Sequence, residues 1–228
     1  MATSGTTAFD LDIDDIIEEA YERCGVRTNS GKDLKSARRS LNIMLSEWGN
    51  RGVHLWKVEL KEQLLSAGTQ TYTAPTNAND VLEAYISTTT GTTSSTNDVS
   101  LTKISRSEYA ALPNKGSQGQ PSQYYVDRQT IPTITLYQTP DATTYTYLKY
   151  YYLKRIEDAG AYTNQADVVF RFIPCMVSGL AYYLSMKKNP QLVQQNKLLY
   201  EDELQRALTE DGQRTSVYIT PQSYFPQG

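Results

Sequence analysis

Histidine and cysteine, the side chains on which most metal sites and nucleophilic active sites depend, are nearly missing from this chain. Its 228 residues include one histidine, His54, and two cysteines, Cys24 and Cys175. A zinc site of the Cys/His type needs about four such ligands, and a nucleophilic triad needs a histidine oriented by a third group. We therefore expect no metal, no cofactor and no catalytic residues. We interpret His54 as a structural or surface residue and the cysteines as reduced core thiols.

An excess of positive charge and a long apolar run are also missing. The chain has 22 Lys and Arg against 25 Asp and Glu, a formal net charge of −3 and a mean hydropathy of −0.53. A protein that grips the DNA backbone carries a basic surface, and a membrane helix needs about 20 apolar residues, so we expect neither class. Residues 1–9 lack the basic and apolar segments of a signal peptide. Tyrosine is abundant, with 18 Tyr against 4 Phe, and suits strands and partly wet interfaces.

Two amphipathic helices are predicted near the start of the chain. Over residues 12–24, the apolar side chains that recur at the spacing of one helical face are Ile13, Ile16, Ile17, Ala20, Tyr21 and Cys24. Over residues 30–50, the corresponding stripe is Leu34, Ala37, Leu41, Met44, Leu45 and Trp48. Acidic residues at the start of the first helix and Gly25 after its end suit helix termini.

The apolar pattern then changes from the period of a helix to the period of a strand. Trp56, Val58 and Leu60 alternate with polar residues, which predicts a half-buried strand. Similar short runs occupy residues 81–87, 99–105, 123–127, 133–137 and 145–153. Turn residues separate these runs, which is typical of an antiparallel sandwich or barrel. The segment Ser87–Asp98, nearly all Thr, Ser, Gly and Asn, is interpreted as a solvated hairpin tip or flexible loop.

Helical periodicity returns after Asp167. One helix is predicted to end near Lys188, and a second begins at Asn189-Pro190, with Asn as N-cap and Pro in the first turn, and ends near Glu210. The simplest architecture is an α+β fold: a helical bundle from N- and C-terminal helices, with an inserted antiparallel β domain and an extended C-terminal arm. The predicted segments are 9–54 and 166–212 for the two halves of the helical region, 55–155 for the β domain and 213–228 for the arm.

Three groups of residues could carry chemistry, and each has a plainer interpretation. Glu18 and Glu22 could be the carboxylates of a cell-wall hydrolase, but acidic runs are common on solvated helix faces. Residues 147–152 could be a tyrosine platform for sugars or bases, but a strand with aromatic cross-strand pairs also accounts for them. Arg38 and Arg39 could touch nucleic acid, although adjacent arginines more often belong to a solvated face.

The last residues, 213–228, are not typical of a disordered tail, because they contain spaced large apolar side chains. Fully extended, they reach roughly 50 Å. Burying the side chains and ordering the backbone nearly cancel in free energy, so one tail would bind a partner weakly and many tails in a ring would bind it well. The candidate docking residues are Val217, Tyr218, Ile219, Pro221, Tyr224 and Phe225.

Several short motifs, in order along the chain, resemble those of tail adaptor proteins of short-tailed phages, also called head-to-tail connector proteins or tubular tail protein A. The first is Ala37-Arg38-Arg39-Ser40-Leu41-Asn42, leading to Glu47-Trp48-Gly49-Asn50-Arg51-Gly52 and Leu55-Trp56. The middle of the chain supplies Ile104-Ser105-Arg106-Ser107-Glu108-Tyr109, Gly119-Gln120-Pro121, Tyr124-Tyr125 and Pro140-Asp141. The last is Gly179-Leu180-Ala181-Tyr182-Tyr183-Leu184. Together these motifs span about residues 9–212.

The resemblance implies a structural virion protein without enzymatic activity. It implies a ring of twelve subunits that joins the portal protein to the tail nozzle protein, at the portal vertex of the virion after assembly in the host cytoplasm. The genome would pass through this ring during ejection without sequence-specific binding, and no membrane would be involved. The resemblance also places the helical region toward the portal, with the arm 213–228 docked there, and the β domain toward the tail. A tail-tube or nozzle component is the first alternative; a cell-wall hydrolase and a tyrosine-based carbohydrate-binding module are more distant ones.

Overall fold

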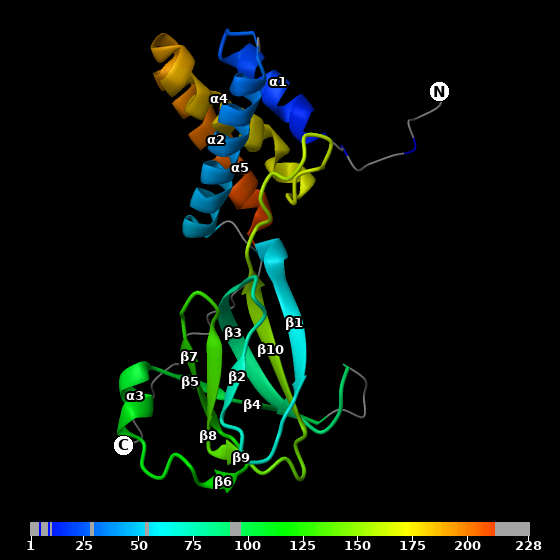
Figure 1. Cartoon of the computed structure of the whole chain (residues 1–228), viewed down its shortest axis with the longest axis vertical. Helices are drawn as coiled ribbons and strands as arrows, with labels where there is room; N and C mark the ends of the chain where they lie inside the picture. The colour runs from blue at the N-terminus through cyan, green and yellow to red at the C-terminus, as the bar shows by residue number, and fades with distance from the viewer. Residues whose placement is uncertain are drawn as a thin grey trace, which may run out of the picture. The chain divides into compact units, whose positions relative to one another are not determined.

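The chain has an α+β fold, as the sequence predicts. The structure, a computed structural model, describes residues 5, 9, 11–27, 30–52, 55–91 and 97–212. Within them the chain forms five α-helices and two four-stranded sheets (Figure 1). Its described residues divide into two compact units: the first contains Asp14–Ala37 and residues 170–212, and the second contains Leu11–Ile13 and Arg38–Val169. The predicted domain limits and the bundle-with-insertion arrangement stay predictions.

The two N-terminal helices form where the apolar periodicity predicts them. Helix α1 spans Ile13–Arg23 and helix α2 spans Gly31–Asn50. All six side chains of the first predicted stripe are buried, and in the second stripe all but the half-buried Leu34 are buried. Gly25, with φ of 70°, takes the left-handed conformation that ends α1. Gly49 lies inside α2, one residue before its last residue.

The C-terminal helices pack against each other within the first unit. Helix α4 spans Ile173–Lys188 and helix α5 spans Val193–Asp211, joined by the 3₁₀ turn η3 at Pro190–Leu192. The rings of Tyr182 and Tyr200 stack with centroids 6.3 Å apart. The prediction that the Asn189 side chain caps the last helix is wrong: its Nδ2 donates instead to the backbone oxygen of Cys24, at 3.1 Å. Asn189 therefore ties the helix connection to the end of α1.

The second unit contains two four-stranded sheets. One has the strand order β1-β10-β3-β4 and the other β2-β8-β7-β5. The strands of the first sheet are β1 (Val58–Leu64), β10 (Tyr147–Lys154), β3 (Ala78–Ser87) and β4 (Asp98–Ser100). Those of the second are β2 (Thr71–Thr73), β8 (Thr133–Tyr137), β7 (Gln123–Asp127) and β5 (Thr102–Ile104). A short pair, β6 (Gln118–Gly119) and β9 (Thr139–Pro140), completes the unit.

Alternating side chains from both sheets build one apolar core. Tyr124 and Val126 of β7 and Ile134 and Leu136 of β8 belong to it. The other sheet contributes Leu148, Tyr150 and Tyr152 of β10, together with Val81, Ala84 and Ile86 of β3. Strands β7 and β8 have the residue limits that the sequence predicts, because both alternate cleanly between this core and the outside.

Several predicted strands differ from the observed ones. The segment Leu55–Lys57 is a 3₁₀ turn, so the strand expected from Trp56 begins at Val58. The run 99–105 is two strands in different sheets, because the chain crosses between the sheets at the buried Leu101. Strands β2, β6 and β9 were not predicted, and the pairs β5–β7 and β6–β9 are parallel although an antiparallel domain was expected. Residues Arg106–Ala111 form the short helix α3.

Candidate contact surfaces

The outer face of the sheet β1-β10-β3-β4 carries exposed apolar and aromatic side chains. In the β1–β10 register, Leu60 lies opposite Tyr151 and Leu64 lies opposite Tyr147. Directly paired residues share a face of a sheet, and the neighbouring Tyr150 and its i±2 partners fill the core, so these four side chains point outward. Leu64 is 59% exposed and Tyr151 is 38% exposed. The apolar side of β1, expected to be buried, therefore faces away from the core of its own unit.

The outer face of the other sheet is polar. Thr71, Thr73, Thr133 and Thr135 lie on it, and the hydroxyls of Thr71 and Thr135 are 3.2 Å apart. One of its aromatic residues, Tyr125, is stacked by Tyr109 of α3, with ring centroids 5.6 Å apart. Of the two outer faces, the one that contains β1 and β10 therefore carries the exposed apolar side chains Leu64 and Tyr151. Exposed apolar groups that lie together are typical of a surface that meets another protein.

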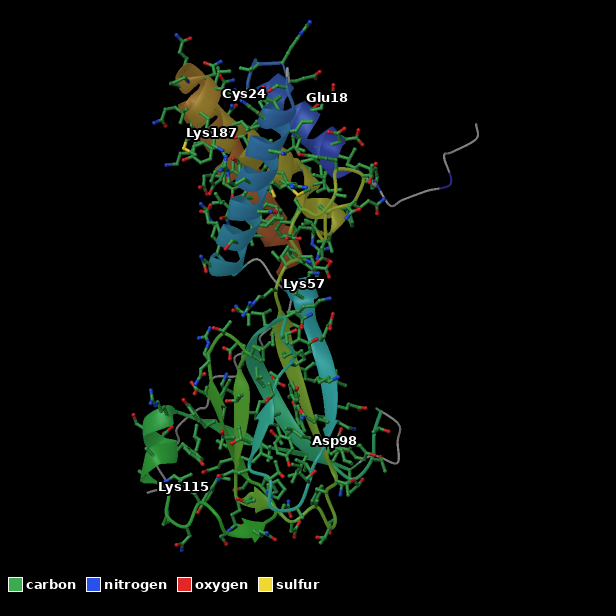
Figure 2. All side chains as sticks on the ribbon, in the orientation of Figure 1. Glu18, Cys24, Lys57, Asp98, Lys115 and Lys187 are labelled. Carbon is green, nitrogen blue, oxygen red and sulfur yellow. The ribbon has the colours of Figure 1, made fainter. Side chains whose placement is uncertain are left out.

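Lys149 stands between the half-buried Tyr147 and the exposed Tyr151 of β10 but is itself buried, with 2% of its side chain exposed. Its Nζ donates to the backbone oxygen of Gly91 at 2.5 Å and to Oδ1 of Asp98 at 3.1 Å, and lies 3.8 Å from Oε1 of Glu62. Asp98 is labelled in Figure 2. Hydrogen bonds from Ser87 and Lys149 hold the pKa of Asp98 below its usual value. A buried ammonium is costly unless it is paired in this way.

This lysine cluster holds both ends of the Thr/Ser-rich loop Ser87–Asp98. The loop is described only at residues 87–91 and 97–98. Gly91 is bound on two sides, since its N–H donates to Glu62 at 2.7 Å and its oxygen accepts from Lys149. The amide of Thr89 donates to the Ser87 hydroxyl at 3.4 Å. The described ends of the loop are therefore anchored to the sheet.

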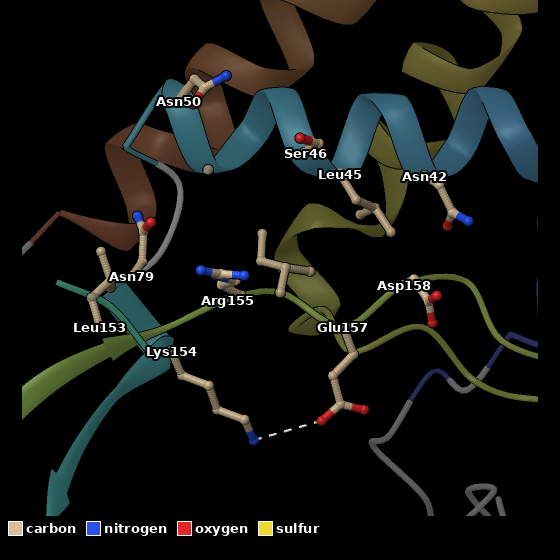
Figure 3. A pocket seen from close by; sticks show the side chains of 12 residues that line it. Asn42, Leu45, Ser46, Asn50, Asn79, Leu153, Lys154, Arg155, Glu157 and Asp158 are labelled. Carbon is tan, nitrogen blue, oxygen red and sulfur yellow. Dashed lines mark ion pairs between the residues drawn. The ribbon is translucent and has the colours of Figure 1, made fainter. Parts of the chain in front are cut away.

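A polar groove of about 400 Å³ lies within the second unit, between the second half of α2 and the segment that follows β10 (Figure 3). Lys154 and Arg155 line it together with Glu157 and Asp158, and Nζ of Lys154 is 3.6 Å from a carboxylate oxygen of Glu157. Neither histidine nor cysteine is among its lining residues. The groove has the mixed charge of a wet surface hollow.

A second ionic cluster stands at the start of the same sheet. The Tyr152 hydroxyl donates to Oε2 of Glu59 at 2.7 Å, and Nζ of Lys154 lies 3.4 Å from the other oxygen of Glu59. The Tyr152 hydrogen bond is the main cause that lowers the pKa of Glu59. Nearby, Lys57 is buried and forms an ion pair with Asp167 (Lys57 is labelled in Figure 2). Lys57 was expected on a solvated strand side.

The residues weighed as catalytic or nucleic-acid-binding do not converge on one site. Glu18 and Glu22 are exposed on α1. Arg38 is fixed, because its Nη1 donates to the oxygen of Gly160 at 3.1 Å and its guanidinium lies 5.1 Å from the ring centre of Tyr162. Arg39, the next residue, is exposed.

Both cysteines are buried free thiols. Burial raises the pKa of Cys24, and it raises that of Cys175 to about 12, so neither supplies a thiolate near neutral pH. No group of three or more His, Cys, Asp or Glu residues suited to a metal occurs in the part of the chain that the structure describes. In the same residues no helix has the length and apolar character to cross a membrane. His54 and the candidate docking residues, Val217 to Phe225, lie outside the described residues.

Comparison with known proteins identifies the family. Residues 8–223 match the family model described as SU10 adaptor protein, which is nearly the whole chain. Among curated proteins no relative matches. The chain therefore belongs to the SU10 adaptor protein family, and the resemblance to phage head–tail adaptors is confirmed. Membership of this family implies a place in the tail of a virion.

Proposed function

We propose that this phage adaptor protein forms a ring of about twelve subunits that joins the portal to the tail nozzle and lines the genome channel. The observation that carries the proposal is the family match over residues 8–223. The ring is structural and non-enzymatic, and its partners are the portal protein, the nozzle protein and neighbouring copies of the chain.

The net charge of −3 supports a channel role. A wall of like charge repels the phosphate backbone, so the duplex slides past it instead of binding. This favours passage of the genome during ejection without sequence-specific contacts.

The β unit supplies surfaces that fit a neighbouring tail component. The outer face around Leu64 and Tyr151 is apolar with polar tyrosine tips, a composition typical of the core of a protein interface. The anchored ends of the loop Ser87–Asp98 place a second contact element on the same sheet. We assign these features to contact with the nozzle protein or an adjacent subunit.

The arm 213–228 is assigned to the portal. Tyr218, Ile219, Tyr224 and Phe225 would be its main anchors, with Val217 and Pro221 beside them. Because one arm binds weakly, the ring supplies the avidity: each bound arm raises the effective concentration of the next.

Electron microscopy of the matching portal ring mixed with this protein tests the proposal. The full chain is compared with a chain that ends at Gly212. We expect a second ring stacked on the portal that is lost on truncation. A stack that survives truncation would keep the adaptor and refute the role of the arm. No stack with either chain would favour a place in the tail tube or nozzle. In a separate assay, peptidoglycan cleavage that depends on Glu18 or Glu22 would support the hydrolase instead.

A further inference from the structure

The exposed side of α1 is acidic. Asp14, Glu18 and Glu22 follow one another at four-residue intervals, so they form a stripe along one side of the helix, on the face that the buried residues leave free. All three are exposed, and among the described residues none of them has an ion-pair or side-chain hydrogen-bond partner. We call these three residues the acidic stripe; Glu18 is labelled in Figure 2.

The exposed side of α2 is basic. Lys32, Lys35 and Arg39 are spaced by three and four residues on the side opposite the buried residues of the helix, such as Leu41 and Met44. They too are exposed and have no ion-pair partner among the described residues. The exposed apolar Ile43, 53% accessible, continues the same line by one turn. Lys32, Lys35 and Arg39 are called the basic stripe below.

The two stripes match in length and charge. At about 1.5 Å per residue, the acidic stripe is about 12 Å long and the basic stripe about 10 Å. Each carries three charges of one sign, on side chains long enough to adjust to one another. Neighbouring surface charges are already paired: Arg23 with Glu19 at 2.8 Å, and Lys188 with Asp33 at 2.7 Å. The unpaired charges are therefore sorted by helix.

We propose that the acidic stripe of one copy of this chain binds the basic stripe of a second copy. Such a contact joins two different surfaces of the same chain, so it can be head-to-tail and repeat around a closed ring. A two-fold contact through either helix alone would oppose like charges instead. The inference rests on the proposed function for ring closure, and it names the helices through which the ring is built.

Charge complementarity favours a second copy over DNA as the occupant of the basic stripe. Three cations on a chain of net charge −3 give a duplex little attraction, and the stripe on α1 would repel it. The same two stripes attract each other in a neighbouring copy. Several parallel ion pairs repeated around a ring add up, although each exposed pair is weak.

Reversed stripes provide the test, measured on the full chain by sedimentation at low and high ionic strength and by portal stacking. One variant is Glu18→Lys with Glu22→Lys, which makes both stripes basic. The other is Lys35→Glu with Arg39→Glu, which makes both acidic. We expect the self-association constant of each variant alone to be at least tenfold lower than that of the parent. An equimolar mixture should restore it, because contacts between unlike variants again join opposite charges. Restoration should disappear in high salt.

A matched control reverses an exposed charge outside the stripes, Lys197→Glu on α5, and should leave association unchanged. Circular dichroism of each variant verifies that the helices form. The proposal is overturned if the variants associate as the parent does, or if the mixture fails to restore association. Portal stacking separates the two proposals: stacks formed by both reversed variants would leave the adaptor role intact and remove this contact. Restored association in the mixture without any portal stack would support this contact and refute the adaptor role.

Discussion

Replacing Lys149 with methionine should unfold the β unit more easily and release the loop Ser87–Asp98. Methionine keeps most of the length of the side chain and removes the ammonium. The ammonium makes two close bonds, to the oxygen of Gly91 and to Asp98, and such charged hydrogen bonds contribute about 1.5–3 kcal/mol each. The substitution also removes the cost of burying a charge, which is about several kcal/mol.

The net change in the free energy of unfolding depends on the two carboxylates that lose their ammonium partner. The side chains of Glu62 and Asp98 are 26% and 37% exposed, so water can replace part of what the ammonium provides. We therefore expect a net loss of about 2 kcal/mol in the free energy of unfolding, well below the cost of stranding a fully buried charge.

Chemical denaturation gives the magnitude, and hydrogen exchange at Gly91 gives the location. The Gly91 amide donates to Glu62, which Lys149 helps to hold, so its exchange should accelerate in the variant. Lys61→Met, at an exposed position of β1, is the control and should change stability by less than about 0.5 kcal/mol. A Lys149→Met protein as stable as the parent, or with unchanged exchange at Gly91, would show that the cluster does not anchor the loop.

Four further predictions concern single side chains. Tyr124→Phe should cost about 1 kcal/mol because its hydroxyl donates to the oxygen of Leu82 at 3.0 Å. Tyr150→Phe should be neutral or stabilising because its buried hydroxyl has no partner among the described residues; equal losses in denaturation would refute this reasoning. Ser105→Ala removes the capping box of α3 and should cost about 1 kcal/mol, with faster amide exchange at Glu108 as the local sign. The pKa of Glu59 is lowered by folding, so its contribution is present above pH 4.5 and is lost as the pH falls; the stability gap between the parent and Glu59→Gln should therefore shrink on acidification, and a gap that grows would contradict it.

The sequence predicts best those helices and strands that bury one side against a single apolar core and expose the other. The stripes of α1 and α2 and the strands β7 and β8 were placed correctly, because each alternates between a single apolar interior and the outside. β1 shows the limit of this reasoning. Its alternation was recognised, yet the apolar side that contains Leu60 and Leu64 faces outward. Periodicity shows that a strand has two unlike sides, and only pairing with β10 shows which side meets the core.

Charged residues show a second limit, because their role depends on partners far along the chain. Lys149 stands in a run of tyrosines. It is buried, and its ammonium is paired with Asp98, which is 51 residues away in the sequence. Arg38 and Arg39 are adjacent and chemically identical, but Gly160 and Tyr162 fix the first while the second stays exposed. Helical spacing explains the difference only after the buried side of α2 is known, since consecutive residues lie 100° apart on the helix. The exposed arginine is then available to a second molecule, and the fixed one is not.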